Sequence, residues 1–87
     1  MIIYRKYRDE DYSNYKIFCQ NNWGKYCHQS NFTHIQWLQS NPSHFINIAV
    51  ESNRILACFH GFLTPIKNGN KIENYYSLHD LMVDKDY

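Results

Sequence analysis

The sequence predicts an α+β domain whose elements follow the order β-α-α-β-β-β, with two helices and a mostly antiparallel sheet. Between residues 12 and 38, apolar side chains recur at steps of three and four, which is typical of helices that bury one face. After Pro42 the apolar period falls to two, and turn signals at residues 52–53 and 67–70 divide this part of the chain into three β-runs. Because domains usually contain about 100–200 residues, we expect residues 1–87 to form a single domain.

The first helix is expected directly after a short strand at residues 1–7. Asp9 is a favourable N-cap, and Glu10 and Asp11 place negative charge in the first turn, where the helix dipole favours it. Gly24 is typical of a helix end. The nearly apolar stripe between these ends consists of Tyr12, Tyr15, Phe18 and Cys19, followed at the same spacing by Asn22.

The second helix is bounded by equally simple signals. Ser30 and Asn31 are N-cap candidates, and proline disfavours helical geometry in its predecessor, so Asn41-Pro42 ends the helix. The stripe of this helix consists of Phe32, Ile35 and Leu38.

Three β-runs complete the chain. We expect strands at residues 45–51, 54–63 and 71–83, joined by a two-residue turn at Ser52-Asn53 and by an Asn-Gly hairpin at residues 67–70. Gly61, inside the second run, predicts either a bulge or a close approach of another group to the backbone.

Charge and composition exclude several classes of protein. The net charge is only +1, and aromatic residues are frequent (17%) but not interleaved with basic ones, so we expect no nucleic-acid partner. No apolar run approaches the roughly 18–20 residues of a membrane-spanning helix, and no signal peptide is recognisable at the start. We therefore expect a cytoplasmic protein with no membrane partner.

The cysteines and histidines show no metal-binding spacing. Three cysteines without a CxxC pair indicate reduced thiols rather than a disulfide framework. Zinc ligands usually come as two closely spaced pairs, and neither pair is present, so we expect no metal site. A zinc-dependent module stays as a minor alternative, and its conceivable ligands are Cys27, His28, His34, His60 and His79.

Three segments together resemble the N-terminal half of the GCN5-related N-acetyltransferase (GNAT) family. Residues 3–11 resemble the first strand and the acidic start of the first helix in that family. Residues 47–61 resemble its second and third strands, joined by a short turn. Residues 78–87 resemble its fourth strand and the polar turn with a tyrosine that follows.

The resemblance implies a function and a set of site residues. GNAT proteins transfer an acyl group from acetyl-CoA or a related thioester to an amine. Their fourth strand splays from its neighbour, and its backbone pairs with the two amides of pantetheine; the matching cofactor-binding positions are Leu81, Met82 and Val83. A catalytic base often comes from the same strand, and the matching position is His79, with Asp80 attracting a cationic amine.

The sequence also departs from the family pattern. GNAT proteins follow the fourth strand with a glycine-rich loop at a helix N-terminus, which holds the pyrophosphate of coenzyme A. Residues 1–87 contain no such loop, so we expect them to hold at most half of a cofactor site and to form a partial GNAT-like domain. Catalysis by this chain alone is therefore an open question.

An incomplete two-layer fold predicts association with another chain. The last β-run would present an apolar edge, and one face of the sheet would lack helices. We expect a homo-oligomer, such as a dimer, or pairing with a second half-domain. The alternative function is a non-catalytic α+β interaction module that self-associates through its terminal strand; the acceptor amine is not readable from the sequence.

Overall fold

The computed structural model describes residues 1–86, apart from the side chain of Tyr76, and contains the predicted elements in the predicted order. The tyrosine that ends the family-like segment, Tyr87, lies outside the described residues. Two short 3-10 turns, η1 (Asp9–Asp11) and η2 (His28–Ser30), accompany the main elements. These are β1 (Ile3–Lys6), α1 (Tyr12–Trp23), α2 (Phe32–Gln39), β2 (His44–Glu51), β3 (Arg54–Asn68) and β4 (Lys71–Val83). The β-α-α-β-β-β prediction is confirmed.

The four strands form one sheet in the order β1-β2-β3-β4, and every neighbouring pair is antiparallel. Each strand therefore lies next to its neighbour in sequence. β1 and β4 are the outer strands, and no strand of residues 1–86 lies beyond β4. The outer edge of β4 consequently presents unpaired backbone groups.

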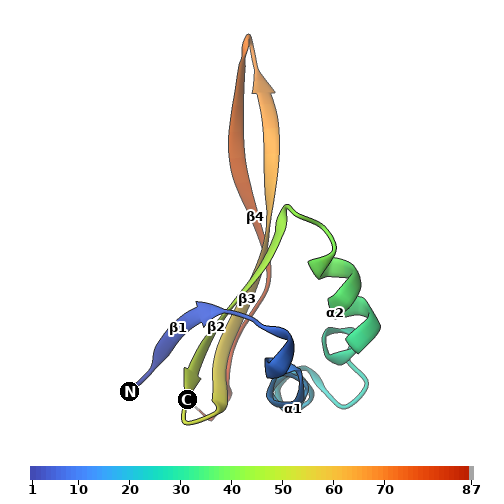
Figure 1. Cartoon of the computed structure of the whole chain (residues 1–87), viewed down its shortest axis with the longest axis vertical. Helices are drawn as coiled ribbons and strands as arrows, with labels where there is room; N and C mark the ends of the chain where they lie inside the picture. Colours follow the sequence, from blue (N-terminus) through green and yellow to red (C-terminus); the bar gives the residue numbers. More distant parts are fainter. Residues whose placement is uncertain (87) are drawn as a thin grey trace.

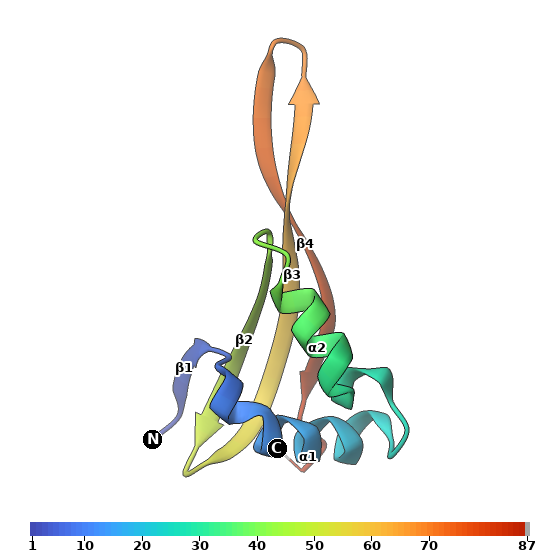
Figure 2. The same ribbon diagram turned by 45° about the vertical axis from the view of Figure 1, so that its right-hand side comes forward.

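Both helices lie on the same face of the sheet (Figures 1 and 2). The buried core lies between them and the strands, and it consists of Tyr7, Tyr15, Phe18, Cys19, Ile35, Ile46, Ile48, Ile55 and Cys58. On the opposite face no helix of the described chain covers the strands, and Tyr4, Leu78 and Val83 are exposed there. One apolar face of the sheet is thus covered and the other is open.

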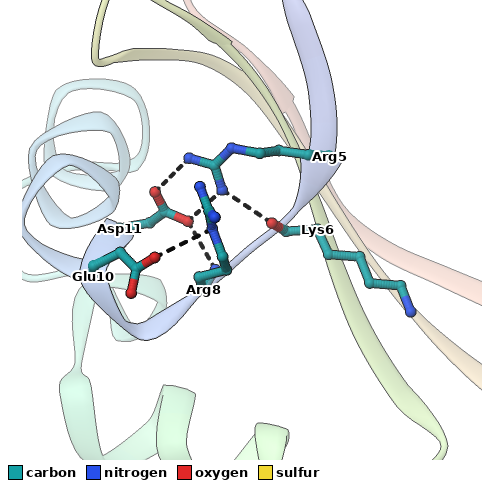
Figure 3. Close-up of polar contacts among 5 residues, drawn as sticks. All are labelled: Arg5, Lys6, Arg8, Glu10 and Asp11. Atoms are coloured by element: carbon teal, nitrogen blue, oxygen red, sulfur yellow. Dashed lines mark hydrogen bonds and ion pairs between the residues drawn. The ribbon is translucent and has the colours of Figure 1, made fainter.

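The start of the first helix differs from the prediction in one residue. Asp9 was expected to be the N-cap, but Asp11 makes the stabilising contacts (Figure 3). Its carboxylate accepts the backbone N–H of Arg8 and two hydrogen bonds from the Arg5 guanidinium, each at 2.7 Å. Arg5 lies on β1. A residue outside the helix therefore determines that Asp11, and not Asp9, makes the stabilising contacts at the helix start.

The turn predictions are confirmed. Asn31 caps α2 by accepting the His34 backbone N–H at 2.9 Å. Ser52 and Asn53, between β2 and β3, have the positive φ values (48° and 67°) that a two-residue hairpin turn requires. Gly61 marks a close approach, because a Cβ atom there would overlap the Phe45 ring.

The β3–β4 hairpin is longer than predicted. β3 was expected to end at residue 63 but continues to Asn68, and its end pairs in register with the start of β4. β2 pairs with β3 only as far as Phe62, so Pro65 lies where β3 has a neighbour on one side alone, a position that tolerates proline. The far end of the hairpin stands clear of both helices (Figure 1).

The helices are short, and α1, with 12 residues, is the longest helix of residues 1–86. None of them has the length and apolar character needed to cross a membrane.

Candidate functional site

A β-bulge in β4 places the predicted catalytic residues. Met82 pairs with Cys58 and His79 pairs with His60, so Asp80 and Leu81 together face the single residue Phe59 of β3. Asp80 takes a positive φ of 52°, which an aspartate tolerates better than most side chains. The bulge turns the Asp80 carboxylate toward the helix-covered face, where Gln29 of η2 donates a hydrogen bond to it at 3.4 Å.

His79 lies in a group of imidazoles on that covered face. Its ring centroid is 5.4 Å from that of His60 on β3 and 6.0 Å from that of His44 on β2. Phe62 stacks on the His79 ring at 5.1 Å. The structure therefore gathers three histidines, one from each of three adjacent strands, which we call the histidine cluster (His44, His60 and His79).

Hydrogen bonds connect the cluster to the core. The Tyr15 hydroxyl of α1 lies 2.6 Å from His60 Nε2, and His44 Nε2 lies 3.2 Å from His60 Nδ1. His60 is only 2% exposed, and burial lowers its pKa from 6.5 to about 4. His60 is therefore neutral at neutral pH, with both ring nitrogens in hydrogen bonds.

Two ring nitrogens of the cluster lack a partner. His44 Nδ1 and His79 Nε2 are buried and make no hydrogen bond within residues 1–86. The other nitrogen of His79, Nδ1, lies 3.4 Å from Asp80 Oδ2. The His79–Asp80 pair thus combines an oriented imidazole with a nitrogen that is free to accept a proton or to bind a ligand.

The buried cysteines are poorly suited to act as nucleophiles. Burial raises the pKa of Cys58 to about 12, and it raises the pKa of Cys19 further above the ordinary thiol value. Since the thiolate is the reactive form, both side chains are inert at neutral pH.

Leu81, Met82 and Val83, the predicted cofactor-binding residues, form the end of β4 at the open edge of the sheet. Leu81 and Val83 are 70% and 57% exposed, whereas Met82 packs against the core. The Asp84 N–H donates to Leu56 O on β3 at 2.7 Å. Because N–H directions alternate along a strand, the Val83 N–H points away from β3, toward solvent.

The open face of the sheet carries a separate hollow of about 430 Å³. Tyr4, Ala49, Ala57 and Phe59 are among its lining residues, and none of residues 79–83 lines it. This hollow therefore lies on the other side of the sheet from the His79–Asp80 pair.

The family resemblance pointed to His79 and Asp80 but not to the residues around them. His44, His60 and Tyr15 were not expected to join the site, because only the pairing of three strands and the seating of α1 bring them together. His60 was considered only as a conceivable zinc ligand. A signal was present in the sequence, because His44 directly precedes the predicted strand at residues 45–51, and His60 and His79 lie within the next two predicted strands.

No protein-family model and no curated protein matches the sequence. Solved structures do match it. The chain is 12% identical to a GNAT family acetyltransferase from Staphylococcus aureus, with a TM-score of 0.77 over 99% of this chain and 64% of that one. It is 13% identical to an acetyltransferase from Trypanosoma brucei (TM-score 0.75, over 100% of this chain and 63% of that one).

A third likeness is to glucosamine-6-phosphate N-acetyltransferase from Arabidopsis thaliana. The identity is 14% and the TM-score 0.75, over 99% of this chain and 62% of that one. The chain therefore has the fold of part of a GNAT acetyltransferase, as its sequence resemblance implied, and spans a little under two thirds of the length of these three proteins.

Proposed function

We propose that the chain is the N-terminal portion of an N-acyltransferase that transfers an acetyl group from acetyl-CoA to an amine. The observation that carries this proposal is the fold, since almost the whole chain superimposes on three acetyltransferases from distant organisms. A fold alone can host unrelated activities, so the site must also suit the reaction. The open edge of β4 and the neighbouring His79–Asp80 pair supply that second support.

In this proposal the end of β4 binds the acyl donor as an added strand. The exposed backbone groups of residues 81–83 would pair with the two pantetheine amides, as an extended peptide pairs with a sheet edge. Asp80 would attract the ammonium form of the amine, and His79 would take its proton. The amine nitrogen then attacks the thioester carbonyl carbon, the C–S bond breaks, and the proton released from the nitrogen passes to the departing thiolate, so that coenzyme A leaves as the thiol.

Calorimetric titration of the chain with acetyl-CoA tests the binding step. We expect saturable binding in the micromolar range. Val83→Pro removes the outward N–H but no bond to β3, so it should weaken binding by about 2- to 10-fold, the contribution of one hydrogen bond. Val83→Ala keeps the N–H and serves as the matched control, with an expected change below about twofold. Absence of binding, or equal affinities for the two variants, would refute pairing at this edge.

Turnover with a panel of primary amines tests the role of His79. His79→Ala should lower the rate at saturating amine by about 10²- to 10⁴-fold, the usual contribution of a general base. The affinity for acetyl-CoA should stay unchanged, because the backbone of β4 is retained. Full activity of His79→Ala would exclude the residue as the base.

A further inference from the structure

The histidine cluster and Asp80 bring metal-binding side chains together in a way that acyl transfer does not require. One donor atom from each of His60, His79 and Asp80 lies within 4.8 Å of the other two. It is the one such group of three histidine, cysteine or carboxylate side chains found within residues 1–86. His44 adjoins it through the 3.2 Å contact with His60.

The spacing of the donor atoms suits a small tetrahedral ion. Ligands about 2.0–2.1 Å from zinc lie roughly 3.3 Å apart when the geometry is tetrahedral. The donor atoms of His60, His79 and Asp80 lie within 4.8 Å of one another, so side-chain rotations that shorten each separation by at most about 1.5 Å would bring them to this spacing.

The unpaired nitrogens give an independent indication of a ligand. Buried polar atoms are nearly always hydrogen-bonded, and an unpaired one in a folded protein often marks an ion or a water. His44 Nδ1 and His79 Nε2 are such atoms, and both belong to the cluster. A bound cation would use lone pairs that the protein leaves without a partner.

The surroundings of His60 resemble the outer shell of a metal site. Metal-binding histidines usually donate their second ring N–H to a neighbouring group, which fixes the ring orientation. In His60 the Nε2 atom lies 2.6 Å from the Tyr15 hydroxyl, so Nδ1 is the nitrogen left to face the cluster.

We propose that His60, His79 and Asp80, with His44 beside them, bind a divalent transition-metal ion of the zinc, cobalt and nickel class. Imidazole nitrogens favour these ions over calcium and magnesium, which prefer all-oxygen sites. The site differs from zinc motifs read from sequence spacing, because its ligands come from adjacent strands and meet only through strand pairing. The proposal does not rest on the acyltransferase proposal, since binding is measured with the metal alone. The two compete at His79, because an imidazole nitrogen that holds a metal ion cannot also take the proton of an amine.

Titration of the reduced, chelator-treated chain with Co²⁺ tests the site. We expect one equivalent to bind, with the visible absorption of low-coordinate cobalt and without a thiolate-to-metal band, and Zn²⁺ should displace it. A strong thiolate band would assign the metal to a cysteine and overturn the proposal. So would the absence of saturable binding.

Two variants and a matched control locate the ion. His79→Ala and Asp80→Asn should each weaken binding by at least about tenfold, since even outer-shell partners commonly contribute about 10- to 100-fold. Asparagine tolerates the positive φ of position 80, so Asp80→Asn is expected to fold. It therefore tests the metal site even if His79→Ala does not fold. His28→Ala removes an exposed imidazole outside the cluster and should leave the affinity unchanged. Binding retained in both site variants, or lost in His28→Ala, would refute the site.

Discussion

At the scale of single residues, the Asp11 carboxylate links the first strand to the first helix. It accepts two hydrogen bonds from Arg5 on β1 and one from the backbone that enters η1 (Figure 3). Asp11 is buried and the Arg5 side chain is largely covered, so this ion pair is shielded from solvent. The neighbouring pair between Arg8 and Glu10 is exposed and longer, at 3.3 Å.

Asp11→Asn should therefore destabilise the protein much more than Glu10→Gln. The first substitution leaves the Arg5 guanidinium without its charged partner, which we expect to lower the free energy of unfolding by about 1–3 kcal/mol. The second affects an exposed ion pair and should change it by less than about 1 kcal/mol. Urea denaturation of the two variants measures the difference. Equal effects would show that the Arg5–Asp11 pair adds nothing beyond surface charge.

The same pair predicts how stability depends on pH. Hydrogen bonds from the Arg5 side chain lower the pKa of Asp11 below its ordinary value. The folded state therefore binds this proton more weakly than the unfolded state, whose aspartate pKa is about 3.9. The contribution of Asp11 to stability is complete above that pKa and is lost as the pH falls through the lower pKa of the folded state. Urea denaturation from about pH 5 to about pH 2 should show a steeper loss for the wild type than for Asp11→Asn; parallel curves would contradict this.

Local chemistry predicts some of these residues and not others. Asn31 and the turn at Ser52-Asn53 were predictable, because caps and hairpin turns depend on nearby backbone geometry. Choosing Asp11 over Asp9 required Arg5, whose position depends on the pairing of β1 with β2. The residue that stabilises a helix start can thus depend on a partner far away in the sequence, and the local sequence pattern carries no information about that partner.

At the scale of elements, the bulge in β4 depends on the backbone conformation of one residue. Asp80 has a φ of 52°, a conformation that β-branched side chains adopt at a cost of roughly 1–2 kcal/mol. Asparagine tolerates this positive φ. Since Asp80→Asn and Asp80→Val both remove the negative charge, the two variants differ in backbone preference and not in charge. Asp80→Val should therefore be about 1–2 kcal/mol less stable than Asp80→Asn. Thermal and urea denaturation compare the two variants directly, and equal stability would mean that the bulge relaxes without cost.

The predicted bounds of the strands were correct where they coincided with turn signals. The predicted end of β3 was wrong. The bounds of β4 were predicted correctly, but the end of β3 was predicted at residue 63, and the strand continues through Thr64 and Pro65 to Asn68. The strand continues because β4 pairs with it along the whole hairpin. The candidate site was likewise predictable only in part. The family resemblance identified His79 and Asp80, whereas identifying His44 and His60 required knowing how three strands pair.

At the scale of the whole molecule, the fold covers one face of the sheet and leaves the other face and one edge open. A sheet with layers on both faces can be apolar on both, whereas a sheet with one face open to solvent normally carries polar side chains on that face. Here Leu78 and Val83 are exposed on the open face, and Leu81 is exposed beside the edge of β4. The chain also spans less than two thirds of the length of the three acetyltransferases whose fold it shares. We propose that contact with further polypeptide buries these surfaces.

If the open edge pairs with a second copy, Leu81→Lys should weaken self-association. A lysine at an edge strand adds charge and an ordered water shell where another strand would have to approach, and edge strands are commonly protected in this way. Leu81 is 70% exposed, so the substitution should leave the fold intact. Ile3→Lys, on β1 at the opposite edge of the sheet, is the matched control, because it adds the same charge at an exposed apolar position away from β4. Sedimentation over a range of concentrations should show a larger monomer fraction for Leu81→Lys than for Ile3→Lys. Identical distributions would mean that copies of this chain do not meet at the edge, which would leave it available to an acyl donor or to a separate half-domain.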